Sequence, residues 1–268
     1  MGKSTRLKPW LTKEAHIKYI EQKIWRLEIP AGTGAGYRLA QLDDYKSLNR
    51  DTFPWKPPFT LNIRARASSQ TIPGTWGFGL WNDPFSFSLG FGGGTRRVPV
   101  LPNAAWFFFA SPQNYLSLQD DLPGAGNLAA TFRTRGLPVP MTMVGALTLP
   151  LFLIPPIARL LRRFGTRYVH QDAKHIKLEV TAWHNYQLLW EEDQVVFHID
   201  GEPQLTTSIS PHAPLGLVIW VDNQFLSFPP KDRLRYGTLP NPNPSWIEIQ
   251  DVYANGKELS IDKKSKSL

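Results

Sequence analysis

Apolar and polar residues alternate along much of the chain, and this alternation predicts short β-strands. In residues 59–67, Phe59, Leu61 and Ile63 alternate with polar neighbours, which is the period-two pattern of a strand with one buried face. Strands at such spacing, with few helical stretches between them, indicate an all-β protein built as a two-sheet sandwich or a barrel. Similar stretches, separated by Gly, Pro and Asn, cover residues 75–81, 104–110, 114–118, 127–134, 175–183, 214–222 and 245–256.

Residues 183–203, WHNYQLLWEEDQVVFHIDGEP, carry the clearest local prediction, a β-hairpin. Residues 191–193 supply its polar turn, and an Asp-Gly pair begins the next turn. Pairing of Trp190 with Gln194 would place His184 opposite Asp200 on one face. Such a pair is either a proton-transfer couple or a hydrogen-bonded framework histidine, and both interpretations stay open.

Residues 137–165 interrupt the β pattern with an apolar, Pro-rich segment. Its prolines break any helix long enough to cross a bilayer, so we expect no transmembrane span. Its last part predicts an amphipathic helix that begins at Pro155-Pro156 and stops at Gly165. One face of this helix carries Ile157, Leu160, Leu161 and Phe164, and the other carries Arg159, Arg162 and Arg163.

Two roles for this insertion stay open. The helix packs on the sandwich with its arginines in water, or the segment forms an apolar flap over a ligand site. The flap would also allow peripheral contact with a membrane surface.

Composition limits the classes of function. The 268 residues include no cysteine, which excludes disulfides and thiolate metal sites. The net charge of +8 comes mostly from residues 1–13 and 257–268, which we predict to be basic tails, and nucleic acid is not expected as a partner. The N-terminal residues lack the apolar core of a secretion signal, so the expected location is cytoplasmic, or extracellular if a leader was removed.

Four segments, in order along the chain, resemble the concanavalin A-like lectin/glucanase superfamily, particularly its family 16 glycoside hydrolases. They are FTLNIRARASSQTIPGTWGFGLWND at 59–83, the hairpin at 183–203, PLGLVIWVDNQF at 214–225 and WIEIQDVYANG at 246–256. The resemblance implies a single antiparallel jelly-roll domain over residues 1–268, with a ligand along its concave face. It further implies a structural calcium ion, as superfamily members often hold, although this sequence does not identify its ligands. No other cofactor is predicted.

The same resemblance implies a retaining glycosidase, provided that the catalytic strand is present. That strand carries Glu, Asp and Glu at alternate positions after the segment corresponding to GTWGFGLW. Retention requires two carboxylates about 5–5.5 Å apart. No glutamate occurs here between Glu28 and Glu179, and the Glu-Glu-Asp run at 191–193 lies in a hairpin turn. We therefore predict that family 16 glycosidase activity is absent.

The remaining site candidates are mainly aromatic residues, which divide between the inter-sheet core and the concave face. On the concave face they would stack on sugar rings or line an apolar pocket. Asp222 and Asn223 end a predicted strand and suit either ligand recognition or a turn cap. The predicted ligand-binding residues are Trp76, Trp81, Trp106, Trp183, Tyr186, Trp220, Asp222 and Asn223.

Two functions fit this pattern. The first is a ligand-binding jelly roll without glycosidase activity, which holds a glycan or an apolar or amphiphilic small molecule on its concave aromatic face. The alternative is an enzyme of another class, such as a cyclase, isomerase or hydrolase, that acts on a hydrophobic substrate in the same cavity. Its candidate acid and base groups are Asp222, His184 and Asp200.

Overall fold

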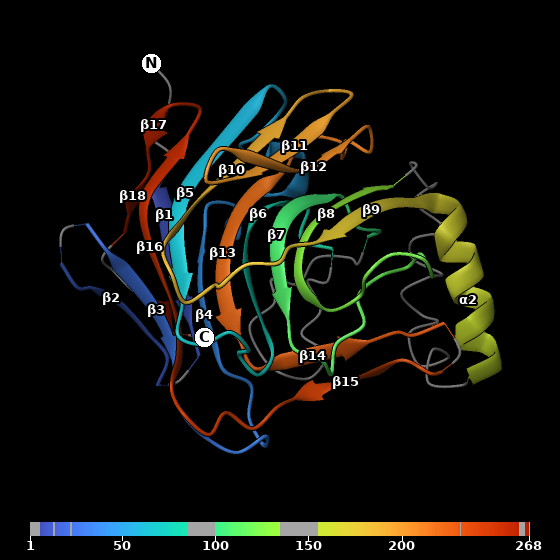
Figure 1. Ribbon diagram of the computed structural model, residues 1–268, viewed down its shortest axis with the longest axis horizontal. Coiled ribbons are helices and arrows are strands. Elements are labelled where there is room, and N and C mark those ends of the chain that lie inside the picture. Colours follow the sequence, from blue (N-terminus) through green and yellow to red (C-terminus); the bar gives the residue numbers. More distant parts are fainter. Residues whose placement is uncertain are drawn as a thin grey trace.

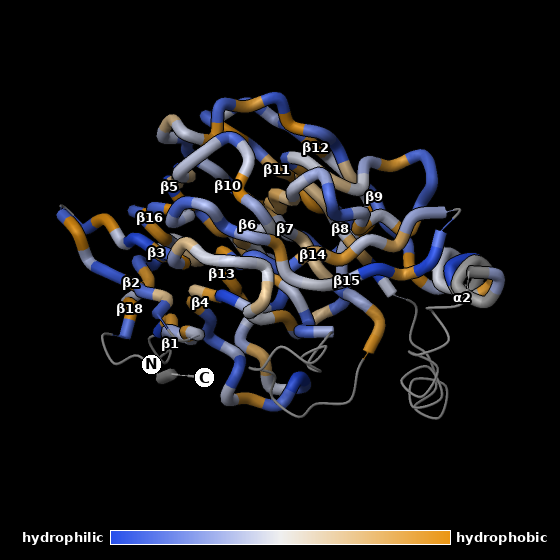
Figure 2. The backbone as a smooth tube through the Cα atoms, turned by 90° about the horizontal axis from the view of Figure 1, so that it is seen from below, coloured by the Kyte–Doolittle hydropathy of each residue, from blue (hydrophilic) through white to orange (hydrophobic). Residues whose placement is uncertain are grey.

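The computed structural model describes residues 6–262 except 13, 22, 85–99, 135–154 and 231, together with residues 266–267. These residues form a β-sandwich of two large sheets, with the helix α2 (Pro155–Tyr168) beyond the β9 edge (Figure 1). Figure 2 shows the two layers from below, with β10, β11 and β12 above β13 and β4. The predicted all-β, two-sheet fold is therefore confirmed.

The nine-stranded sheet has the strand order β18-β1-β4-β13-β6-β7-β8-β9, with β19 also beside β1. Its pairs are antiparallel except where β18 and β19 run parallel to β1. The strands are β1 (Arg6–Leu11), β4 (Leu39–Asp43), β6 (Thr75–Trp81), β7 (Ala104–Ala110), β8 (Gly126–Thr134), β9 (Val169–His175), β13 (Gly216–Asp222), β18 (Ser260–Ile261) and β19 (Lys266–Ser267).

The eight-stranded sheet has the order β12-β11-β10-β5-β16-β3-β2, with β17 beside β16. Its strands are β2 (His16–Tyr19), β3 (Trp25–Ile29), β5 (Phe59–Ala67), β10 (His184–Trp190), β11 (Val195–Ile199), β12 (Glu202–Thr207), β16 (Ser245–Ala254) and β17 (Lys257–Glu258). The remaining elements are a small hairpin of β14 (Gln224–Ser227) and β15 (Arg235–Thr238), and the 3-10 helix η1 (Arg50–Thr52).

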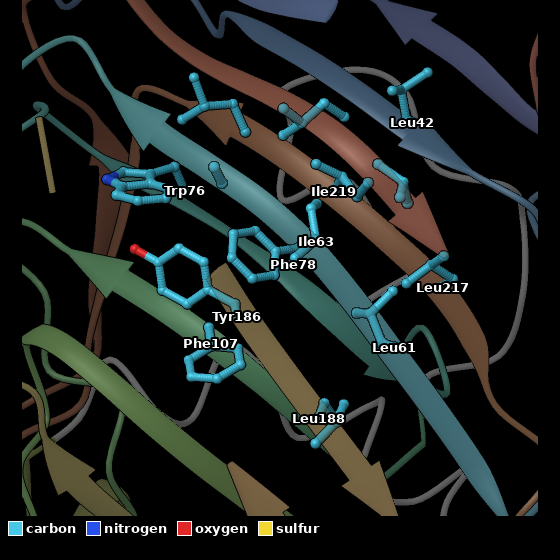
Figure 3. Packing of buried hydrophobic residues seen from close by; sticks show 14 of the residues in the cluster. Leu42, Leu61, Ile63, Trp76, Phe78, Phe107, Tyr186, Leu188, Leu217 and Ile219 are labelled. Carbon is cyan, nitrogen blue, oxygen red and sulfur yellow. The ribbon is translucent and has the colours of Figure 1, made fainter. Parts of the chain in front are cut away.

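The main core lies between the two sheets, because alternate side chains of each strand point inward. On β5 the inward residues include Leu61 and Ile63, as the alternation predicts. Figure 3 shows Ile63 close to Phe78 and Ile219, and Leu61 close to Leu217, all three from the opposite sheet. The nine-stranded sheet is also covered on its outer face, where two further apolar clusters lie. It is therefore buried on both sides, whereas the outer face of the eight-stranded sheet is polar.

Two predicted strands are wrong because side chains take the place of a neighbouring strand. Residues 114–118 form only an isolated bridge, and the Asn114 amide donates to the carbonyl oxygen of Gly74. In the 175–183 segment only His175 belongs to a strand, and the side chain of Gln70 hydrogen-bonds the backbone of Leu178 and Val180 instead. Such bonds satisfy backbone groups without a β-ladder.

The predicted basic tails contribute strands to the nine-stranded sheet. Residues 6–11 form β1, which pairs with β4 and buries Leu7 completely. At the other end of the chain, β18 and β19 pair with β1. These short segments carry too few apolar residues to show strand periodicity, and the pairing partners that fix them lie far away in the sequence.

The predicted stop of the helix at Gly165 is also wrong, because α2 continues to Tyr168. The predicted division of this helix into a buried apolar face and an exposed arginine face is wrong at two positions. Arg162 is 4% exposed, whereas Leu160 is 53% exposed. Arg162 is buried because it donates to the carbonyl oxygens of Ser117 and Phe228 and pairs with Asp120. Most of the 137–165 insertion lies outside the described residues.

No helix in the described ranges has the length and apolar character needed to cross a membrane.

Candidate ligand-binding face

The next strand that the structure describes after β6 is β7, the position at which the family 16 resemblance implies a catalytic strand. It pairs with β6, the TWGFGLW strand, along its whole length, from Trp81 opposite Ala104 to Thr75 opposite Ala110. Phe107 and its alternate neighbours point into the inter-sheet core. The outward positions on β7 are Ala104, Trp106, Phe108 and Ala110, and none of them carries a carboxyl group.

Four aromatic rings form a continuous surface on this outer face, here called the aromatic platform: Trp81, Trp106, Phe108 and Trp220. The Trp106 ring lies at its centre, with centroids 5.7 Å from Trp81, 5.5 Å from Phe108 and 5.8 Å from Trp220. The Phe108 and Trp220 rings are 5.6 Å apart. The strands that carry the platform, β6, β7 and β13, are drawn as arcs in Figure 1.

Two glycines of β6 make room for the platform. Gly77 pairs with Trp220, and a Cβ added there would come within 3.0 Å of the Trp220 ring and 2.3 Å of the Phe107 carbonyl oxygen. Gly79 pairs with Trp106 and has a φ of +152°, which side chains rarely adopt. The TWGFGLW strand therefore carries glycine where the rings lie across it.

A buried carboxyl group holds one end of the platform. The Trp220 indole donates to the Thr75 hydroxyl at 2.9 Å, and this hydroxyl donates to Asp222 Oδ1 at 2.8 Å. The Tyr37 hydroxyl lies 3.4 Å from Asp222 Oδ2. Burial raises the pKa of Asp222 to about 7, although the hydrogen bonds from Thr75, Gln224 and Tyr37 oppose the rise. Asp222 thus positions Trp220 and is itself almost inaccessible.

Two further buried carboxyl groups were not singled out from the sequence. Burial raises the pKa of Asp43 to about 6 and that of Asp44 to about 7. Asp43 accepts hydrogen bonds from Gln41 and from the backbone of Lys46, and Asp44 accepts from the Trp55 indole. These bonds fix the loop after β4. The Asp-Asp pair at the end of an apolar strand is the only signal that the sequence offers.

The structure corrects the placement of three predicted aromatic residues. Trp76 stacks on Phe109 inside the inter-sheet core, at a centroid distance of 3.6 Å. Tyr186 lies in the same core (Figure 3), where its hydroxyl has no partner among the described residues. Trp183 contacts Arg64 and Arg66 of β5, on the eight-stranded sheet. None of the three lies on the platform, because each occupies the other face or the other sheet.

Asn223 holds neighbouring loop segments together through side-chain hydrogen bonds and is not an accessible ligand group. Its side chain accepts from the Arg38 amide and donates to the carbonyl oxygens of Gly36 and Leu239. Every polar atom of the side chain is engaged, and the residue is fully buried. Of the two interpretations left open for this strand end, the structure shows the turn cap.

His184 and Asp200 do meet, but in a register different from the predicted one. Trp190 pairs with Val195 and not Gln194, yet the His184 Nδ1 lies 2.6 Å from Asp200 Oδ2. His184 Nε2 faces the carbonyl oxygen of Glu179 at 3.1 Å, so both ring nitrogens are engaged. Burial favours a higher pKa for Asp200, but hydrogen bonds from Asn185 and His184 outweigh it and lower the pKa.

This pair belongs to the eight-stranded sheet, whereas Asp222 belongs to the nine-stranded sheet. The three candidate acid and base groups therefore do not form one site. The geometry of His184 and Asp200 is that of a framework pair at a turn, where Asp200 has a φ of +52°.

Part of the platform is accessible and part is covered. Phe108 and Trp220 are each 8% exposed and pack with Tyr45 and Phe53 in one cluster. Trp81 and Trp106 are only half-buried. The accessible ring surface of the platform therefore belongs mainly to Trp81 and Trp106.

Within the described residues, no group of three or more His, Asp or Glu side chains is placed to hold a metal ion. The calcium ion implied by the superfamily resemblance stays a prediction.

No family model and no curated protein matches this chain. Solved structures share its fold at low identity. A glycoside hydrolase family protein from Mycobacterium thermorestibile aligns at 12% identity with a TM-score of 0.50, over 94% of this chain and 84% of that chain. LamAcat from Zobellia galactanivorans aligns at 12% identity with a TM-score of 0.46, over 88% and 78%. A family 16 protein of Bacteroides ovatus, in complex with a mixed-linkage glucan product, aligns at 10% with a TM-score of 0.46, over 94% and 90%. The similarity to the first of these structures confirms the predicted two-sheet jelly-roll fold.

Proposed function

We propose that this protein binds a glycan on the aromatic platform and does not hydrolyse it. The observation that carries the proposal is the half-buried pair Trp81 and Trp106, whose ring centroids are 5.7 Å apart on the outer face of the nine-stranded sheet. Flat aromatic rings with one accessible face suit stacking on sugar rings, which are apolar on their faces and polar at their edges. The glycines of β6 keep these rings in place over the sheet.

Hydrolysis is not part of the proposal, because β7, the strand that would supply the catalytic carboxyl groups, contains no Asp or Glu. Ala104, Trp106 and Phe108 occupy the alternate outward positions of β7. Asp222, the nearest carboxyl group in the platform network, is buried and hydrogen-bonded to Thr75. A retaining mechanism needs two accessible carboxyl groups about 5–5.5 Å apart. The chain keeps the binding scaffold and replaces the reactive positions by aromatic and small residues.

The similar fold of a glycoside hydrolase family protein supports a glycan as the ligand class, by analogy of fold alone. No similar structure supports an apolar small molecule. The alternative ligand class, an apolar small molecule, rests on the apolar cluster that Phe108 and Trp220 form with Tyr45 and Phe53 on this face. The following experiment separates the two ligand classes.

Laminaritetraose and cellotetraose are titrated into the protein by isothermal calorimetry. We expect binding of at least one of them, and Trp106→Ala should weaken it at least tenfold, about 1.4 kcal/mol, because the central ring of the platform is lost. Trp183→Ala is the matched control, since this tryptophan lies on the other sheet and should leave the affinity unchanged.

Equal affinity of wild type and Trp106→Ala, with both variants folded by thermal melting, would contradict the proposal. Absence of glucan binding, together with binding of an apolar fluorescent probe that Trp106→Ala removes, would favour the apolar ligand class instead.

A further inference from the structure

A hollow lies on the outer face of the eight-stranded sheet, on the side of the sandwich opposite the aromatic platform. Its volume is about 290 Å³, at the lower end of the range for small-molecule sites. The lining residues come from β5, β10, β11, β16 and the turn at Gly201. Those whose polar side chains point to the outer face are Asn62, Arg64, Asn185, Gln187, His198, Asp251 and Tyr253.

Two β-bulges shape this hollow. The pairing of β16 with β5 shifts register between Gln250 and Tyr253, where Asp251 adopts a φ of +53°. The pairing of β11 with β12 shifts between Phe197 and His198. Bulges turn side chains away from the regular pleat and occur frequently beside functional sites. Here they lie on the two sides of the same hollow.

Two nitrogen-bearing groups in the hollow have unused hydrogen-bonding capacity. Throughout the described ranges, the Arg64 guanidinium makes no hydrogen bond or ion pair, and it contacts only the face of Trp183, 5.3 Å from the ring centroid. His198 Nδ1 is buried and likewise has no partner among these residues. A partly buried group without a partner loses its hydration without compensation. The Arg64 guanidinium, which is only partly buried, therefore favours a ligand that supplies acceptors.

The neighbouring arginines differ from Arg64 because they are already paired. Arg66 donates to Glu248 Oε2 at 2.7 Å, and Arg26 donates to Glu248 Oε1 at 2.9 Å. The Glu248 carboxylate thus binds two arginines, and Arg26 also pairs with Glu28 at 3.8 Å, whereas Arg64 has no carboxylate partner among the described residues. Asp251 lies at the rim, where it accepts a hydrogen bond from Gln250.

Amide groups complete the lining. Gln187 donates to the Asn62 side-chain oxygen at 2.8 Å, which leaves the Gln187 oxygen and the Asn62 amide nitrogen for a ligand. Amide and phenol groups both donate and accept, as sugar hydroxyls do. A planar guanidinium matches a carboxylate or sulfate group.

We propose that this hollow is a binding site for an acidic saccharide, with Arg64 on its carboxylate or sulfate group and Asn62 and Gln187 on its hydroxyls. The site lies on the sheet opposite the aromatic platform and is independent of the function proposed for that platform.

The test compares three probes by NMR titration of the ¹⁵N-labelled protein: methyl β-glucuronide, methyl β-glucoside and inorganic sulfate. A sulfated methyl glucoside is a fourth probe, and its comparison with the glucuronide shows whether the site prefers a sulfate or a carboxylate group. We expect the acidic sugars to bind at least tenfold more tightly than the neutral sugar, with shifts at β5, β10 and β11. Added salt should weaken this binding, because the contact with Arg64 is charged.

Arg64→Gln should lower the affinity for the acidic sugars at least tenfold, and Asn62→Ala should lower it for the acidic sugars but not for sulfate. Arg163→Gln, which removes an exposed arginine of α2, and Trp106→Ala on the platform are controls that should not change it. Unchanged affinity in Arg64→Gln, or equal affinity for glucuronide and glucoside, would overturn the proposal. Sulfate binding as tight as that of the sugars would overturn it as well, since the amides would then contribute nothing.

Discussion

At the scale of single residues, four of the aspartates show how surroundings decide the role of one side-chain type. Asp222 orders Trp220 through the Thr75 hydroxyl, Asp43 and Asp44 hold the loop after β4, and Asp200 pairs with His184 at a turn. Burial raises the pKa of the first three, whereas hydrogen bonds lower that of Asp200. None of the four is an accessible acid beside the aromatic platform.

The raised pKa of Asp222 predicts a pH-dependent stability. Between its ordinary value of 3.8 and the folded value of about 7, the folded protein binds more protons than the unfolded chain. The free energy of unfolding therefore falls as the pH rises through this window. Asp222→Asn keeps the shape and removes the titration, so urea unfolding between pH 5 and pH 8 should show a shallower fall.

The pKa values of Asp43 and Asp44 are raised by burial as well. In Asp222→Asn the free energy of unfolding should therefore still fall with rising pH, but less steeply than in the wild type. Asp232→Asn, at an exposed position, is the control for loss of one carboxylate. An unchanged pH slope in Asp222→Asn would show that this carboxyl group is not buried as described.

At the scale of secondary-structure elements, one buried arginine ties α2 to the rest of the molecule. Arg162 donates to Ser117 O at 2.8 Å and to Phe228 O at 2.7 Å, and it pairs with Asp120 at 2.8 Å. Asp120 is largely exposed, so its ion pair adds little to stability. The two carbonyl groups matter more, because they lose their donors if the arginine is removed.

Arg162→Met should therefore destabilise the protein by about 2–4 kcal/mol, from unpaired carbonyl groups and loss of the helix contact. Chemical denaturation gives the free energy, and hydrogen exchange should show faster exchange in α2 than in the sheets. Arg163→Met, at the adjacent exposed position, should change stability by less than about 0.5 kcal/mol. Equal effects of the two substitutions would contradict the anchoring role.

At the scale of the whole molecule, the sandwich presents two unlike faces, an aromatic one on the nine-stranded sheet and a polar one on the eight-stranded sheet. The aromatic face carries no carboxyl group at the alternate outward positions of β7, where the resemblance to family 16 implies the catalytic groups. We therefore expect no release of reducing sugar from β-1,3 or β-1,4 glucans at any pH between 4 and 8. Release that disappears in an Asp222→Asn variant would show that a relocated carboxyl group acts on the glycan.

Much of the fold follows from local patterns in the sequence. The alternation in 59–67 predicts β5, and the β6 and β7 ranges match the predicted 75–81 and 104–110. The missing glutamates of the catalytic strand are likewise visible in the sequence alone. These features depend on residue type and on the two-residue period of a strand, both of which are local.

The tertiary structure alone decides which face of each strand meets a ligand. The nine-stranded sheet is buried on both faces, so both sets of alternate residues on β6 are apolar or small. Trp76 points into the core and Trp81 points outward, although the sequence treats the two alike. In a strand covered on both sides, hydrophobicity no longer distinguishes the faces, and the side on which the second sheet packs assigns them.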